Sequence, residues 1–190
     1  AYFDCMLPFT RFAVGGADFT PMASYGNTFG NKTVTQAHLV AETIMFECGI
    51  QTMADKPAVY RAHVAYENLF KNIPTSWDDS ILVDGDPGHY VNMARTTGDD
   101  WYVSLLANEA RTAAFNLDFL DDGATYTAYI FRDSDDPMND DTSKAIITET
   151  MTVTKGQAMS IDLKETGGAV VKLVKTADWN ELNAALTEAK

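Results

Sequence analysis

Two aspartates lie within or directly after short apolar runs, and turn-forming residues flank these runs. Asp18 lies within residues 17–21, a run that ends at Pro21, and Asp55 directly follows residues 50–54. Both runs have the length and composition of short buried strands. A carboxylate at the C-terminal end of such a strand can bind ligand hydroxyl groups or orient a neighbouring arginine. The structural alternative is a helix cap or an ion pair at the rim of the fold.

The histidines and cysteines of the chain favour structural roles. The three histidines are far apart and none has the spacing of a zinc site, so we expect no metal site within this chain. Cys5 and Cys48 lie in apolar, helix-like contexts. We therefore expect two buried thiols, although a disulfide between them remains an alternative.

The acidic stretch over residues 133–141 is the nearest approach to low complexity. Its closely spaced carboxylates suggest calcium, but Pro137 interrupts the ligand pattern, and a glycine and a terminal glutamate are missing at the required offsets. We expect a solvated turn. The aromatic residues Trp101, Tyr126 and Phe131 are expected in the core rather than on a binding platform.

The composition indicates a folded chain with an acidic surface. Its 190 residues are 46% hydrophobic, and 14 basic against 27 acidic residues give a net charge of −13. Nucleic acids and anionic membranes repel such a surface, so neither is an expected partner. No apolar run approaches the roughly 20 residues that span a bilayer. The chain opens in an apolar, helix-like run without a capped start, which suggests the C-terminal part of a larger protein.

Before Pro74 the apolar residues recur mainly with helical periodicity. Thr35 is a candidate cap for the second expected helix, and Cys48-Gly49 is its expected end. Helices alternate here with short strands, as in successive βα units of a parallel sheet or barrel. We expect helices over residues 3–14, 36–48 and 57–71, strands over 17–21 and 50–54, and a loop over 22–33.

After Pro74 the period changes to two, and turn signals separate several short strands. This spacing is typical of an antiparallel β-sandwich, here of about eight strands. We expect a barrel portion over residues 1–76, a sandwich over 77–175 and an amphipathic helix over 176–190, with the first two parts rigidly docked. The expected strands cover 81–83, 89–95, 101–106, 112–117, 125–131, 145–153, 158–163 and 168–174.

The order of several short motifs resembles glycoside hydrolase family 97. The similarity runs over nearly the whole chain up to Lys175, although no single motif is diagnostic. In the first part it rests on 7–11 (Leu-Pro-Phe-Thr-Arg), 18–21, 46–51, 54–57 and 73–78. In the second part it rests on 88–90, 94–95, 101–103, 117–120 and 126–128.

The resemblance implies a fold and an activity. Family 97 enzymes are α-glucosidases or α-galactosidases with an N-terminal β-sandwich, a (β/α)₈ barrel and a C-terminal β-sandwich. By this resemblance the chain holds the last βα units of the barrel and the C-terminal sandwich. It also implies calcium in the complete enzyme, with ligands upstream of this chain, an oligosaccharide substrate, and a periplasmic or secreted location in bacteria. The remaining segment of the same enzyme is then a partner.

The resemblance also bears on individual residues. It suggests that Asp18 and Asp55 bind sugar hydroxyls, and that Tyr25 or Phe29 in the 22–33 loop stacks on a sugar face. A Glu-His pair usually precedes the first helix, but residues 1–4 do not contain it. We therefore assign no catalytic residue. Asp4 is expected to be a helix N-cap, with a catalytic role as the alternative.

Two other functions remain open. The sandwich could be a stand-alone carbohydrate-binding or interaction module, with the helical part as a support. The chain could also be a degenerate product without activity. The first hypothesis, a piece of a glycosidase, differs from both because it predicts exposed apolar side chains on residues 3–73, where barrel neighbours are missing.

Overall fold

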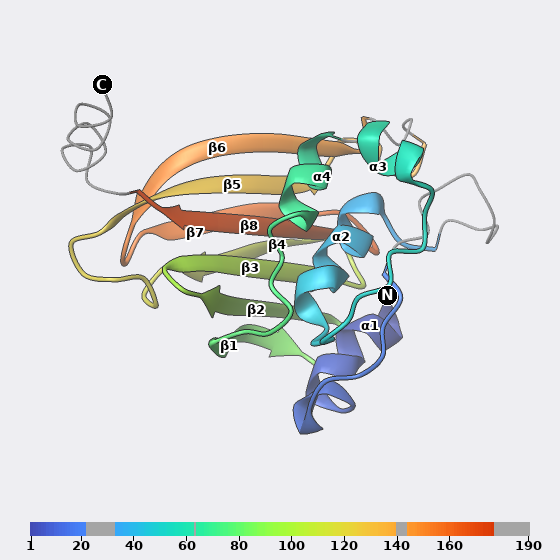
Figure 1. Cartoon of the computed structure of the whole chain (residues 1–190), viewed down its shortest axis with the longest axis horizontal. Helices are drawn as coiled ribbons and strands as arrows, with labels where there is room; N and C mark the ends of the chain where they lie inside the picture. Colours follow the sequence, from blue (N-terminus) through green and yellow to red (C-terminus); the bar gives the residue numbers. More distant parts are fainter. Residues whose placement is uncertain (22–32, 63, 140–143, 177–190) are drawn as a thin grey trace.

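The protein folds into three layers around a central antiparallel sheet. The computed structural model describes residues 1–21, 33–62, 64–139 and 144–176. A six-stranded sheet forms the middle layer, a two-stranded sheet covers one face of it, and helices lie on the opposite face (Figure 1). The expected antiparallel β-sandwich is therefore confirmed, and it carries a third, helical layer.

Every pair of neighbouring strands in the two sheets is antiparallel. The large sheet has the order β1-β2-β3-β8-β5-β6, and β4 pairs with β7. Within the described residues the strands are β1 (Asp79–Asp86), β2 (Tyr90–Thr97), β3 (Asp100–Ala107), β4 (Arg111–Asn116), β5 (Thr125–Asp133), β6 (Ile146–Thr154), β7 (Ala158–Leu163) and β8 (Gly168–Lys175).

The core of the sandwich follows the alternation of its strands. In β5 the side chains of Tyr126, Ala128 and Ile130 are buried toward the two-stranded sheet, whereas Phe131 is buried toward the helices. Because successive strand residues point to opposite faces, one strand contributes to both cores. Trp101 also packs against the sandwich core, which confirms that these aromatic residues serve the core.

The helix α2 (Gln36–Met45) is the main element of the helical layer, and it packs across β3 and β8. Thr35 caps it by accepting a hydrogen bond from the His38 amide at 3.1 Å, as expected. On the sheet side, the Ser104 hydroxyl donates to the Ala41 carbonyl at 2.7 Å, and Arg95 donates to the Met45 carbonyl at 2.9 Å. These bonds hold a nearly fully buried helix at a fixed position on the sheet.

A close contact between backbones lets α2 approach the sheet. A Cβ atom added to Gly168 at the start of β8 would lie 2.6 Å from the Cα of His38. Glycine is therefore required there, because any side chain would push the helix away.

The helices before Pro74 differ in extent from the expectation. The range 3–14 forms α1 (Tyr2–Met6) and two 3₁₀ turns, η1 (Leu7–Phe9) and η2 (Phe12–Val14), since Pro8 has no N–H to continue an α-helix. The helix α2 ends three residues early, because Phe46 turns extended and stacks on Phe12 with ring centroids 4.7 Å apart. The range 57–71 holds α3 (Pro57–Ala62) and α4 (Val64–Phe70).

The two strands expected before Pro74 do not form as strands in the described residues. The ranges 17–21 and 50–54 share only one parallel bridge, between Phe19 and Gln51. Two flanking hydrogen bonds, from Ala17 to Glu47 and from Ala54 to Pro21, keep the segments side by side. A parallel pair is stable when further strands and layers cover it.

The first part of the chain shares a core with the sandwich instead of standing apart from it. Cys5, Val40 and Phe46 pack with Tyr102 and Val170 of the large sheet in one buried cluster. The expected rigid docking of the two parts agrees with this. The loop over 22–33, except for its last residue, and the expected helix over 176–190, except for its first residue, lie outside the described residues. No helix among the described residues has the length and apolar character needed to cross a membrane.

Candidate functional site

A shallow pocket lies beside the starts of the two parallel segments, 17–21 and 50–54, which come after η2 and α2 in the chain. Its cavity volume is about 400 Å³, and its lining includes Asp18, one of the expected substrate-binding residues. The pocket is lined by Arg11, Gly16, Ala17, Asp18, Cys48, Gly49 and Ile50.

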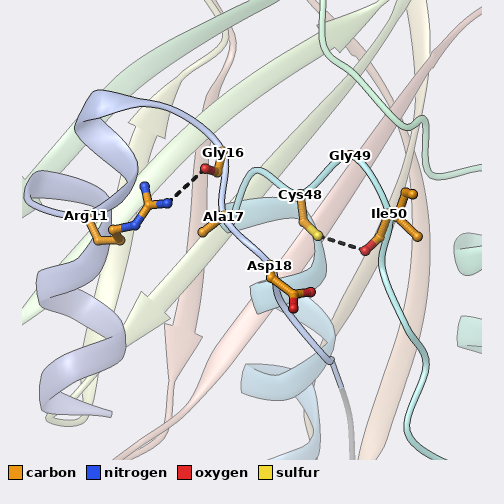
Figure 2. Close-up of a pocket in the computed structure, with 7 residues that line it drawn as sticks. All are labelled: Arg11, Gly16, Ala17, Asp18, Cys48, Gly49 and Ile50. Carbon is orange, nitrogen blue, oxygen red and sulfur yellow. Dashed lines mark hydrogen bonds between the residues drawn. The ribbon is translucent and has the colours of Figure 1, made fainter.

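The residues that line the pocket come from two stretches of the chain, 11–18 and 48–50 (Figure 2). Asp18 is exposed, so its carboxylate is available to a ligand. The Arg11 guanidinium donates to the carbonyls of Gly15 and Gly16, each at 3.1 Å. Arg11 is exposed, and through these carbonyls it holds the turn after η2.

The two cysteines are both buried and unpaired, which confirms the expectation of free thiols. Cys48 borders the pocket and donates to the Ile50 carbonyl at 2.9 Å. Cys5 lies in the core beneath α2, and burial raises the pKa of its thiol to about 12. Burial of both side chains does not favour a redox role, since a reactive thiol is usually exposed.

The structure does not place Asp18 and Asp55, the two expected substrate-binding residues that it describes, in one pocket lining. Asp18 lines the pocket, whereas Asp55 does not belong to its lining and lies half-buried at the start of the α3 region. There, the Asp55 amide donates to the Tyr60 hydroxyl at 3.1 Å. Tyr25 and Phe29 lie outside the described residues.

Asp4 is not the N-cap that we had expected. It lies inside α1, whose N-cap is Ala1, and it faces His38 on α2. Burial acts to raise the pKa of Asp4, but His38 and the amino terminus outweigh it and lower the pKa to about 2. The carboxylate of Asp4 therefore pairs both with the amino group of Ala1 at the start of its own helix, at 2.8 Å, and with His38 on α2, at 3.4 Å.

The acidic stretch begins inside the protein at Asp133, and only its later part, where Asp135 and Asp136 are exposed, is the solvated turn that we had expected. Asp133 at the end of β5 is buried, and it accepts a hydrogen bond from the Gly168 amide at 3.2 Å. Burial raises its pKa to about 6, although hydrogen bonds from Thr35 and Gly168 act to lower it. Asp135 is exposed, and residues 140–143 lie outside the described part of the chain.

One group of residues that could hold a metal escaped the sequence analysis. His38, Glu42 and Asp4 lie with their ligand atoms within 4.8 Å of one another, among the residues that the structure describes. The i, i+4 spacing of His38 and Glu42 on one helix was the available signal. Asp4 is 34 positions earlier in the sequence, and only the packing of α1 on α2 brings it to them.

The comparisons with known proteins decide the family. The model of the glycosyl-hydrolase 97 C-terminal, oligomerisation region matches residues 76–174, which is more than half of the chain. The chain belongs to glycosyl-hydrolase family 97. The matched range begins just before β1 and ends one residue before the end of β8, so it covers all but the last residue of the sandwich of this family 97 chain.

Two curated relatives extend the likeness beyond the sandwich. A retaining alpha-galactosidase of Bacteroides thetaiotaomicron is 32% identical over 141 residues, which are 69% of this chain and 21% of that protein. A probable retaining alpha-galactosidase of Streptomyces bingchenggensis is 33% identical over 112 residues, 58% of this chain and 18% of that protein. The family 97 chain thus spans about a fifth of the length of these relatives.

Solved structures of the family share the arrangement of the elements. A variant of a family 97 enzyme from Pseudoalteromonas sp. strain K8, in complex with panose, superposes with a TM-score of 0.83 at 29% identity. The match covers 93% of this chain and 29% of that one. The same enzyme in complex with acarbose gives a TM-score of 0.82 at 29% identity and the same coverage.

Calcium, which the family resemblance implies, does not fit the residues described here. Calcium takes six to eight oxygen ligands. The group formed by Asp4, His38 and Glu42 offers one nitrogen and two carboxylates. The pocket has a single carboxylate, that of Asp18, among its described lining. We therefore derive no step of a reaction through calcium in this part of the protein.

Proposed function

We propose that this chain is the C-terminal part of a larger family 97 glycoside hydrolase, which cleaves α-galactosidic or α-glucosidic bonds. In this proposal residues 1–76 are the end of its (β/α)₈ catalytic barrel, and the sandwich supports that barrel. The curated relatives named as retaining alpha-galactosidases support the reaction class, and the sugar complexes of the Pseudoalteromonas enzyme support an oligosaccharide substrate.

The parallel contact between residues 17–21 and 50–54 carries the barrel part of the proposal. It differs from the strand pairs of the two sheets, all of which are antiparallel. In the chain, α2 stands between the two segments, and α3 follows the second one. This order of strand-like segment, helix, strand-like segment and helix is that of βα units, in which parallel strands are neighbours.

Exposed apolar side chains on the same part of the molecule indicate what covers it. The relative exposure is 74% for Phe3, 84% for Val14 and 81% for Ile50. Large apolar groups this exposed are typical of surfaces that contact other protein. In the complete enzyme we expect the earlier barrel strands and helices to lie there.

The chemistry of the reaction requires groups beyond those in this pocket. Glycoside hydrolysis generally uses two carboxylates that flank the scissile bond, at about 5–5.5 Å from each other in retaining enzymes. Asp18 is the one carboxylate among the described residues of the pocket. We propose that it binds a sugar hydroxyl and that the catalytic pair and the calcium ligands lie upstream. We propose that Asp55 and Tyr25 contact the same substrate.

The proposal also includes a periplasmic or secreted location for the complete enzyme.

The test uses the complete protein that contains this chain. We expect it to hydrolyse 4-nitrophenyl α-galactoside or α-glucoside, with activity that calcium increases, whereas the 190-residue chain alone is inactive. The Asp18→Asn variant should raise KM more than it lowers kcat, because hydroxyl binding is its role. The control is Asp122→Asn, which removes only an exposed ion pair with Lys155. A complete protein without activity on either glycoside would refute the proposal and favour a binding module.

A second function, subunit assembly, has support from β6. This edge strand pairs only with β5, and its residues from Thr148 to Thr152 are exposed on both faces. Native proteins usually protect or cover such edges. The description of the matched family region names oligomerisation. We propose that β6 and its exposed Met151 lie at a contact between two copies of the enzyme.

This second proposal is tested by the mass of the complete enzyme in solution. Light scattering should find an oligomer for the natural protein and a monomer, or a tenfold weaker association, for Met151→Asp. Asp122→Asn again serves as the control. An unchanged association constant for Met151→Asp would show that β6 is not the contact.

A further inference from the structure

A buried histidine faces two carboxylates at the junction of α1 and α2. His38 and Glu42 lie one turn apart on α2, and Asp4 reaches them from α1. The side chain of His38 is fully buried, and that of Glu42 is 9% exposed. The Asp4 side chain is 27% exposed, so one side of the group is open to solvent.

The orientation of the ring follows from its other nitrogen. His38 Nδ1 lies 2.9 Å from the carbonyl oxygen of Gly167, an acceptor that cannot donate. Nδ1 therefore carries a proton and donates it, and Nε2 faces Asp4 and Glu42. Histidines that bind metals usually donate the second ring N–H to a carbonyl or a carboxylate in this way.

The distances at Nε2 suit a metal ion better than a direct hydrogen bond. Nε2 lies 3.4 Å from Asp4 Oδ2 and 3.5 Å from Glu42 Oε1, and it makes no well-formed hydrogen bond to either. An N–H···O bond is normally 2.7–3.2 Å long. Two ligands of a tetrahedral zinc ion, with bonds of about 2.0–2.1 Å, lie about 3.3–3.4 Å apart.

We propose that His38 Nε2, Asp4 and Glu42 bind one Zn²⁺ ion. Three protein ligands and a water on the open side of Asp4 would complete a tetrahedral shell. The ion would fasten α1 to α2 and to the turn before β8, where Gly167 holds the ring. We assign the ion no part in the proposed reaction, because its ligands are separate from the residues that line the pocket.

The charges around the ring explain why a cation is needed. Two ionised carboxylates beside a neutral Nε2 would place negative charge against a lone pair. Without metal a proton fills this place: burial lowers the pKa of His38, but Asp4, Glu42 and the Gly167 carbonyl outweigh it and raise the pKa to about 9. Asp133 on β5 adds a further acidic group that faces His38. A divalent ion balances Asp4 and Glu42 completely, whereas the imidazolium balances one of them and leaves Asp4 to the Ala1 ammonium, 2.8 Å away.

Zinc must displace that proton to bind. The reaction exchanges Zn²⁺ for the proton on His38 Nε2, so about one proton is released for each ion bound at pH 7. Zinc affinity should then rise about tenfold for each unit of pH between 7 and 8.5.

The experiment is a calorimetric titration of the metal-free chain with ZnCl₂, in two buffers of different ionisation enthalpy, with metal content measured after dialysis. We expect one Zn²⁺ per chain, about one proton released at pH 7, and a higher Tm with zinc. Glu42→Gln and Asp4→Asn should each weaken zinc binding at least tenfold.

A matched control exists on the surface. His89 contacts Glu109 at 3.2 Å in an exposed pair of the same chemistry, and His89→Gln should leave zinc binding unchanged. The amino group of Ala1 lies 2.8 Å from Asp4 Oδ2 and competes for that oxygen. The titration is therefore repeated with a short N-terminal extension, which turns this amine into an amide and should not weaken binding.

Two results would overturn the proposal. In the first, the natural chain binds zinc no more tightly than the Glu42→Gln variant does, and ¹⁵N spectra recorded with zinc present show that His38 is still an imidazolium. The other is a zinc ion that is lost in His89→Gln but kept in Glu42→Gln. Neither result depends on glycosidase activity, so the site and the proposed reaction are tested separately.

Discussion

At the scale of single residues, His38 makes the contacts on which the position of α2 and the pH dependence of stability both depend. It bonds to Gly167 through Nδ1, faces two carboxylates through Nε2, and lies with its backbone against Gly168. Its neighbours raise its pKa from the ordinary value of 6.5 to about 9. Folding therefore takes up a proton between these pH values, and stability depends on pH.

We predict that the free energy of unfolding falls as the pH rises from 6.5 to 9. The protonated ring contributes stability that is complete below pH 6.5 and is lost as the pH passes the folded-state pKa, on the order of 3 kcal/mol in total. Urea unfolding at several pH values, with a chelator to remove metal ions, measures this. His38→Gln should abolish the slope, and His89→Gln should keep it. An equal slope in His38→Gln would assign the pH dependence to other groups.

Gly168 is the second residue with a sharp prediction. Alanine there would place a Cβ 2.6 Å from the Cα and 3.0 Å from the N of His38, so α2 must move. We expect Gly168→Ala to lower the free energy of unfolding by about 1–3 kcal/mol, as measured by urea titration. Gly49→Ala is the matched control, because no atom lies within 4 Å of its added Cβ. Equal effects of the two variants would contradict the packing argument.

At the scale of elements, α2 links the two parts of the chain. Thr35 caps it, Ser104 and Arg95 bond to its carbonyls, and its buried side chains join the sheet in one core. Helix propensity contributes little to the stability of a ten-residue helix, so its position depends on these tertiary contacts.

The cap gives a test at this scale. Thr35→Ala removes the acceptor of the His38 amide and the hydroxyl that bonds to Asp133, and we expect it to lower the free energy of unfolding by about 0.5–2 kcal/mol. Thr35→Ser keeps the hydroxyl and should recover most of the loss in the same urea titration. If serine were as harmful as alanine, the lost methyl contact and not the cap would explain the effect.

At the scale of the whole molecule, the three most exposed large apolar side chains of the described residues precede the sandwich. The two-stranded sheet and the helices protect the large sheet, whereas Phe3, Val14 and Ile50 remain exposed in the region that precedes it. This difference is expected if the missing neighbours of the first part belong to the same enzyme.

The triple variant Phe3→Ser, Val14→Thr, Ile50→Thr tests this difference. In the isolated chain it should reduce self-association and the binding of a hydrophobic dye, with little change in unfolding free energy. In the complete enzyme the same changes should destabilise the protein, by roughly 1.5–3 kcal/mol for each side chain that is buried there. Leu82→Thr, at an exposed position of the sandwich, is the control. If the complete enzyme tolerated the triple variant, these residues would not lie against the barrel.

The sandwich and the capped helix α2 could be predicted from sequence, because alternation of period two, turn residues and a cap are local properties. The family could be recognised from the order of short motifs in the same way. The strands over 17–21 and 50–54 could not be decided locally, since a parallel strand exists only with its neighbours. Tertiary structure alone brought Asp4 to His38 and Glu42 and buried Asp133, because residues far apart in sequence meet only when α1, α2 and the sheet pack together. The same packing left Asp18 in a pocket and placed Asp55 outside its lining.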